Sequence, residues 1–100
     1  PELEQYLVQI VMATRTPEAF DAKMANWIEF GVSPRATIAL DRCARAHAWL
    51  AGRDFVGPDD IQAVAHNVLR HRIILSYEAE AEGITVDQVL DNILNLVAVP

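Results

Sequence analysis

Apolar residues recur every three or four positions in several stretches of the chain, which is the spacing of a single buried face on an α-helix. The stretch Glu2–Arg15 contains six such positions, Leu3, Tyr6, Leu7, Ile10, Val11 and Thr14. Near the other end, Thr85 and Gln88 form a capping box before a run with the same spacing up to Val97. The pattern therefore predicts one helix over Glu2–Arg15 and another over Thr85–Val97.

Signals for the start and the end of a helix mark a third element in the middle of the chain. Ser33 is a suitable N-cap, Pro34 suits the first helical position and Gly52 is a suitable stop. We therefore expect a central helix over Pro34–Ala51. Its predicted buried stripe is Ala36, Leu40, Cys43, His47 and Leu50, and the residues predicted to lie off that stripe are Arg42, Arg45 and Trp49.

The same signals predict two further helices. Thr16 offers a cap before Pro17, which predicts a less regular helix over Pro17–Trp27. Gly57 precedes a proline and two aspartates, which predicts a helix over Pro58–Arg70 with acids at its positive end.

Two short apolar segments read as strands. Asp54–Val56 is too short for a helix, and Arg72–Leu75 is rich in β-branched residues. We expect these two segments to pair and to pack on the helices, with Glu78–Gly83 as an acidic linker after them. The predicted fold class is therefore mainly α, with four to five helices and a minor two-stranded β element in one domain, residues 1–100.

Composition and charge narrow the function classes. The 100 residues carry 8 basic and 14 acidic side chains, a net charge of −6, and the charge is segregated: residues 33–76 are net +2, while residues 1–32 and 77–100 are net −3 and −5. The acidic balance disfavours binding to nucleic acid or to an anionic membrane. Because Cys43 is the single cysteine and no apolar run is long enough to span a bilayer, we expect a cytoplasmic protein without a transmembrane segment. The chain begins at Pro1, so we expect it to be a piece of a longer polypeptide.

Most of the chemically active side chains have ordinary structural explanations. The four glycines are dispersed and form no phosphate-binding loop. His66 and His71 are five residues apart, too far around a helix to share a metal ion, so no metal site is expected. His47 and Cys43 fall on the predicted buried stripe and are expected to pack there. The alternating Glu78, Glu80 and Glu82 indicate a solvated segment, and Asp59 and Asp60 are explained by the helix dipole.

Arg35 is the exception, because the positive end of a helix dipole disfavours a cation by roughly 0.3 to 1 kcal/mol. An anion at this position would meet free backbone N–H groups and a forked guanidinium. The competing explanation is an arginine extended into solvent or paired with a nearby acid.

Several ordered segments resemble one protein family. Gly31–Ala36, which reads Gly-Val-Ser-Pro-Arg-Ala, resembles the sensor 2 motif that opens the lid helix of MoxR-type AAA+ ATPases. Gly52–Ile61 is similar to the lid turn of that family, Val68–Ile73 to its histidine-arginine segment, and Ala13–Arg15 to its upstream element. Gly57 departs from the pattern, since the family usually has a threonine cap there.

The resemblance implies that residues 1–100 are the C-terminal lid subdomain of such an ATPase, with the sensor 2 helix at about 34–51. The nucleotide-binding core, with ATP and Mg²⁺, would lie in an N-terminal domain absent from this chain. The isolated lid would then hold no catalytic residue, no metal and no cofactor of its own. Ser33 and Pro34 would present the helix, and Arg35 would sense the γ-phosphate.

The resemblance also implies partners. The lid would contact its own core domain and the neighbouring subunits of a ring, typically a hexamer, and Arg42, Arg45 and Trp49 are candidates for such an interface. MoxR-type ATPases resemble chaperones in maturation or metal insertion, often with a von Willebrand A-domain partner.

Two functions from other classes remain open at this level. In the first, the chain is a stand-alone helical interaction module whose terminal helix, Thr85–Val97, docks on a partner. In the second, the basic middle segment binds nucleic acid, which the overall acidic charge makes the weakest of the three.

Overall fold

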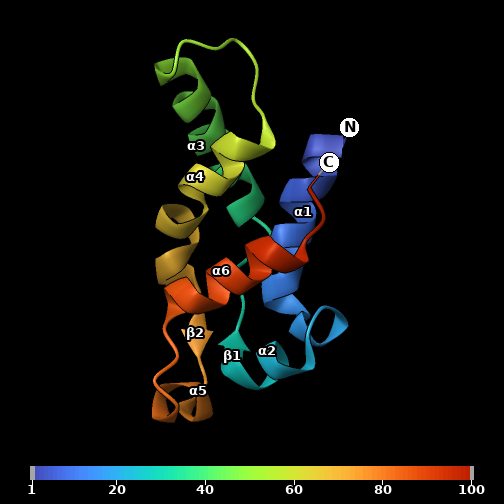
Figure 1. Cartoon of the computed structure of the whole chain (residues 1–100), viewed down its shortest axis with the longest axis vertical. Helices are drawn as coiled ribbons and strands as arrows, with labels where there is room; N and C mark the ends of the chain where they lie inside the picture. Colours follow the sequence, from blue (N-terminus) through green and yellow to red (C-terminus); the bar gives the residue numbers. More distant parts are fainter. Residues whose placement is uncertain (1, 100) are drawn as a thin grey trace.

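Six α-helices and a two-stranded sheet make up residues 2–99, the part of the chain that the computed structural model describes (Figure 1). Two short 3-10 turns, Pro17–Ala19 and Arg70–Arg72, complete the order of elements. The helices are α1 (Glu2–Arg15), α2 (Ala22–Trp27), α3 (Ala36–Leu50), α4 (Pro58–Leu69), α5 (Tyr77–Ala81) and α6 (Val86–Leu96), and the strands are β1 (Ile28–Phe30) and β2 (Ile74–Leu75). The mainly α fold class predicted from the sequence is confirmed.

The core lies where α1, α3, α4 and α6 meet. Figure 1 shows α3 and α4 as a hairpin, with α6 crossing the middle of the molecule. The apolar face of α6 is buried against α1 and α4, as expected from its spacing. Its capping box is also as predicted: Thr85 Oγ1 accepts from Gln88 N at 3.1 Å, and Gln88 Oε1 accepts from Thr85 N at 2.8 Å. The fully buried centre includes Ile10, Leu40, Ile61, Leu69 and Ile93.

The buried stripe of α3 follows every fourth residue and consists of Ala36, Leu40, Ala44 and Ala48. The stripe predicted after Leu40 was therefore wrong: Cys43 and Leu50 are exposed, and His47 is only half-buried. Alanines on this row let the two helices of the α3–α4 hairpin approach closely, so the small residues, and not the larger apolar ones, face the partner helix.

The small sheet pairs β1 with β2 in antiparallel fashion, with Ile28 opposite Leu75 and Phe30 opposite Ile74. The predicted second strand was correct at its apolar end, but its predicted partner, Asp54–Val56, is a loop. This loop joins α3 to α4 at the opposite end of the molecule from β2 (Figure 1). The loop Asp54–Val56 therefore cannot pair with β2, as its composition had suggested.

Two other predicted segments differ in their details. The single helix expected over Pro17–Trp27 is split into the 3-10 turn and α2, because Asp21 Oδ1 accepts from Lys23 N at 2.9 Å and caps a new helix. Thr16 does not cap, since its hydroxyl donates back to Met12 O at 3.1 Å. The expected linker Glu78–Gly83 lies largely within α5, which Ser76 caps by accepting from Ala79 N.

Within residues 2–99, no helix combines the length and the apolar character that crossing a membrane requires.

Candidate functional site

Arg35 lies in the tight turn that leads into α3, with its side chain exposed. Ser33 Oγ accepts from Arg35 N at 3.1 Å and so stabilises this turn. The prediction of Ser33 as the N-cap was wrong, because Arg35 occupies the N-cap position of α3 and no side chain caps it. The backbone N–H groups of Ala36, Thr37 and Ile38 all bond three residues back, to Ser33, Pro34 and Arg35. The α-helix therefore begins at Ala36, two residues later than expected. These bonds also correct the expectation of free N–H groups here, because the turn uses them itself.

The guanidinium of Arg35 is thus the group that this turn offers to an anion. Among residues 2–99, no carboxylate forms an ion pair with it. The turn holds an unpaired cation at the positive end of a 15-residue helix, an arrangement that an approaching anion would stabilise.

The loop before Arg35 is fastened to the C-terminal end of α1. Thr14 Oγ1 accepts from Val32 N at 3.1 Å and donates to Val11 O at 2.7 Å, and Arg15 Nη1 donates to Val32 O at 3.1 Å. Gly31 passes so close that a Cβ atom built there would lie 2.1 Å from Thr14 O. The two segments that resemble family motifs, Ala13–Arg15 and Gly31–Ala36, therefore form one structural unit.

The predicted interface residues Arg42, Arg45 and Trp49 project from the exposed side of α3, off the buried stripe as predicted. Arg45 Nε lies 3.0 Å from Asp41 Oδ2 in an exposed ion pair. Trp49 is 75% exposed.

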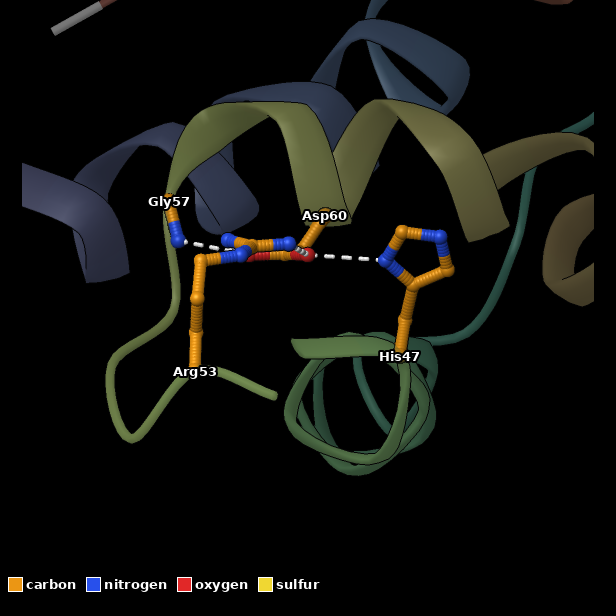
Figure 2. Close-up of polar contacts among 4 residues, drawn as sticks. All are labelled: His47, Arg53, Gly57 and Asp60. Carbon is orange, nitrogen blue, oxygen red and sulfur yellow. Dashed lines mark hydrogen bonds and ion pairs between the residues drawn. The ribbon is translucent and has the colours of Figure 1, made fainter. Parts of the chain in front are cut away.

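A second polar cluster lies at the loop end of the α3–α4 hairpin, away from Arg35, and is centred on Asp60 (Figure 2). Asp60 is 0% exposed, and its two oxygens accept from Arg53 Nη1 at 2.7 Å and Nη2 at 2.6 Å. Asp60 Oδ2 also accepts from Gly57 N at 2.9 Å, and Oδ1 lies 2.7 Å from Nδ1 of His47. The bonds from Arg53, and then that from Gly57, hold the pKa of Asp60 well below its usual value. The hydrogen bond to Asp60 in turn raises the pKa of Arg53.

The explanation of Asp60 by the helix dipole alone was therefore wrong. Its buried carboxylate closes the α3–α4 loop, and this role was missed because the partner arginine lies seven residues away. A signal was present in the sequence: Asp60 stands three residues after Gly57, a residue that has no side chain with which to cap α4.

Of the two remaining histidines, one is paired with an aspartate and the other is exposed. His66 Nε2 lies 2.8 Å from Asp91 Oδ1, and His71 is exposed. Across residues 2–99, no three His, Cys, Asp or Glu side chains converge in a way that could hold a metal ion.

Taken together, the fold and site define a small helical domain in which, among residues 2–99, Arg35 stands without an ion pair at the start of the central helix. The AAA lid domain family matches residues 21–93. The chain belongs to this family, and it is the lid of a MoxR-type protein, as its motifs predicted.

Two curated relatives and one solved structure carry the same domain. Chaperone MoxR1 of Mycobacterium tuberculosis is 41% identical over 99 residues, which cover 98% of this chain and 26% of the relative. Protein MoxR of Paracoccus denitrificans is 39% identical over 107 residues, covering 100% of this chain and 31% of the relative. The crystal structure of a candidate ATPase from Cytophaga hutchinsonii matches with a TM-score of 0.93 and 46% identity, over 99% of this chain and 30% of that one. The chain thus spans about a quarter to a third of the proteins that it matches.

Proposed function

We propose that this chain is the lid that covers the nucleotide in a MoxR-type AAA+ ATPase, and that Arg35 contacts the terminal phosphate of ATP. The observation that carries the proposal is the unpaired Arg35 guanidinium, held at the start of α3 by a loop that α1 anchors. A forked guanidinium matches the geometry of phosphate oxygens.

In this proposal Arg35 acts through electrostatics. It would stabilise the charge that develops on the transferred phosphoryl group, and it would transfer no proton. The P-loop, the acidic pair that holds Mg²⁺ and the attacking water would belong to a separate nucleotide-binding domain. ATP and Mg²⁺ are therefore cofactors of the longer protein and not of the isolated lid.

The wider assembly is part of the same proposal. Closure of the lid over the nucleotide, through the contact of Arg35, would couple the state of the nucleotide to movement in a hexameric ring in the cytoplasm. A chaperone-like role is supported by the name of the mycobacterial relative, Chaperone MoxR1. A von Willebrand A-domain protein is the partner class that the resemblance implies.

The test is Arg35→Ala in the complete protein, with ATP turnover measured at saturating ATP. We expect turnover to fall on the order of 100-fold, the loss typical of one preorganised transition-state donor. Arg35→Lys keeps the charge but loses the fork, so it should recover turnover only in part. Lys23→Ala, an exposed cation in α2, is the matched control and should leave turnover unchanged. Unchanged turnover in Arg35→Ala, with the fold verified by circular dichroism, would refute the proposal.

The alternative of a stand-alone interaction module loses its predicted docking surface. Val89, Leu90 and Ile93, on the apolar face of α6, are already buried inside the domain. That face is part of the core and is not available to a partner.

A further inference from the structure

A second arginine, Arg15, is bonded to the loop that carries Arg35. Arg15 is the last residue of α1, and its Nη1 donates to Val32 O at 3.1 Å. The neighbouring Thr14 Oγ1 accepts from Val32 N at 3.1 Å. The end of α1 therefore binds both backbone groups of Val32, and this arrangement holds the guanidinium of Arg15 at a defined place on the loop.

The guanidinium of Arg15 lacks a counter-charge. Arg15 is exposed, and among residues 2–99 it forms no ion pair with a carboxylate. A guanidinium has five N–H donors, and the bond to Val32 O engages only the Nη1 group. The Nε and Nη2 donors of Arg15 thus remain available to an acceptor that approaches the loop.

Fastening the loop does not by itself require an arginine. The carbonyl of Val32 needs one donor, which a neutral amide side chain could supply. The negative end of the α1 dipole favours a cation at position 15, but a lysine would meet that preference equally well. What the arginine adds is a charged, forked donor whose position the loop fixes, and such a donor suits a phosphate.

Arg15 and Arg35 are close enough to share one anion. Arg35 stands three residues after Val32, so at most about 11 Å separates their Cα atoms. The turn shortens this path further, because Ala36 N donates to Ser33 O at 2.9 Å. Both arginines are exposed, so their long side chains can reach the same ligand. Two cations at such a separation repel each other, and an anion between them would remove that repulsion.

The terminal phosphate of ATP matches this pair in charge and in hydrogen bonding. A terminal phosphate carries roughly two negative charges and three acceptor oxygens, which suffice for two guanidinium groups. Resting on the proposed function, we infer that Arg15 is a second contact to the terminal phosphate, beside Arg35. The lid would then bind the phosphate from two elements, the end of α1 and the start of α3.

The inference is tested by isothermal titration calorimetry on the complete purified protein with Mg²⁺. The probes are an ATP analogue with a non-hydrolysable imido bridge before the terminal phosphate, and ADP, which lacks that phosphate. Arg15→Gln removes the charge but keeps an N–H donor for Val32 O. It should weaken binding of the analogue by roughly ten-fold and leave binding of ADP unchanged. Arg15→Lys keeps the charge without the fork, so its affinity for the analogue should lie between those of Arg15→Gln and the wild type.

Two results of this titration would overturn the inference. In the first, Arg15→Gln binds the analogue as tightly as the wild type does. In the second, it loses affinity for the analogue and for ADP to the same extent, which a contact confined to the terminal phosphate cannot cause. Lys23→Ala removes another exposed cation and should change neither affinity, which controls for the net charge of the protein.

A double-mutant comparison separates a direct contact from support of Arg35 through the loop. If Arg15 contacts the phosphate itself, Arg15→Gln should weaken the analogue by roughly ten-fold again in a protein that already carries Arg35→Ala. The absence of a further loss in that background would refute the contact and make Arg15 a positioning residue. Thr14→Val is the matched control, because it removes a bond to the same loop without removing a charge. A loss in Thr14→Val equal to that in Arg15→Gln, again with Arg35→Ala present, would also refute the contact.

The same variants keep this inference separate from the proposed function. If Arg35→Ala lowers turnover but Arg15→Gln leaves binding of the analogue unchanged, the contact of Arg35 stands and that of Arg15 fails. If Arg35→Ala changes neither turnover nor binding, but Arg15→Gln weakens the analogue and not ADP, the contact of Arg15 stands and the proposed role of Arg35 fails.

Discussion

Asp60 and Arg53 form a parallel two-bond pair in which the carboxylate is completely buried, with N–O distances of 2.7 and 2.6 Å. The same carboxylate accepts the Gly57 N–H, so a single side chain both closes the α3–α4 loop and caps α4. A helix that begins at glycine has no side-chain oxygen at its N-cap position. Asp60, in the first turn, makes the reciprocal bond of a capping box by accepting from the N–H of Gly57 itself.

We expect Asp60→Asn to destabilise the fold strongly. The amide NH₂ group would face an arginine that can only donate, which leaves a partly buried cation without its counter-charge. The melting temperature should fall on the order of 10 °C in a domain of this size, measured by far-ultraviolet circular dichroism. Asp59→Asn changes the neighbouring exposed aspartate and should have almost no effect. Equal melting temperatures for the two variants would contradict this role of Asp60.

The Arg53–Asp60 pair should also make stability depend on pH. Arg53 holds the pKa of Asp60 below its ordinary value of 3.8. The pKa of Asp60 is lower in the folded than in the unfolded chain, so the pair stabilises the fold fully at pH values above the unfolded pKa. This stabilisation is lost as the pH falls from there toward the folded pKa. In urea unfolding, the midpoints of the wild type and Asp60→Asn should therefore keep a constant separation down to about pH 5 and converge below about pH 4. A separation that is the same at neutral pH and at about pH 2 would contradict the depressed pKa.

Local signals in the sequence were sufficient to place most of the helices. The capping box at Thr85 acts over three residues, so the sequence around it determines the structure. The signals at Ser33 and Pro34 placed the start of the central helix to within two residues of Ala36. The position of Arg35 at the start of the central helix followed from the same reasoning.

Features that depend on distant contacts were not predictable in this way. Cys43 and Ala44 are both apolar enough for a buried stripe, and only the close approach of α4 selects Ala44. The pairing of β1 with β2 joins residues more than 40 positions apart, so Asp54–Val56 looked like an equally good partner for β2. The burial of Asp60 required knowing that Arg53 folds back onto it.

We expect Gly31→Ala to disturb the loop that carries Arg35. The added methyl group would lie 2.1 Å from Thr14 O, a backbone atom that cannot move without shifting α1. Overpacking of this kind costs about 1 to 3 kcal/mol of unfolding free energy. Gly57→Ala is the matched control: its Cβ would meet nothing closer than Asp60 Oδ2 at 4.0 Å, so stability should change by less than about 0.5 kcal/mol. Equal unfolding free energies for the two variants in urea would refute the close-approach argument.

Thr14→Val tests the hydrogen bonds that fasten this loop, because valine has nearly the same shape but offers no acceptor to the buried Val32 N–H. An unsatisfied buried donor costs about 1 to 3 kcal/mol, so urea unfolding should show a loss of that size. Thr16→Val also removes one hydroxyl bond, the one to Met12 O, but at an exposed position, and it should cost less than about 0.5 kcal/mol. In the complete protein, Thr14→Val should in addition lower ATP turnover while Thr16→Val does not, since Thr14, unlike Thr16, bonds to the loop that positions Arg35. A loss of stability without any loss of turnover would mean that the loop is fastened for folding alone and that Arg35 finds its place without it.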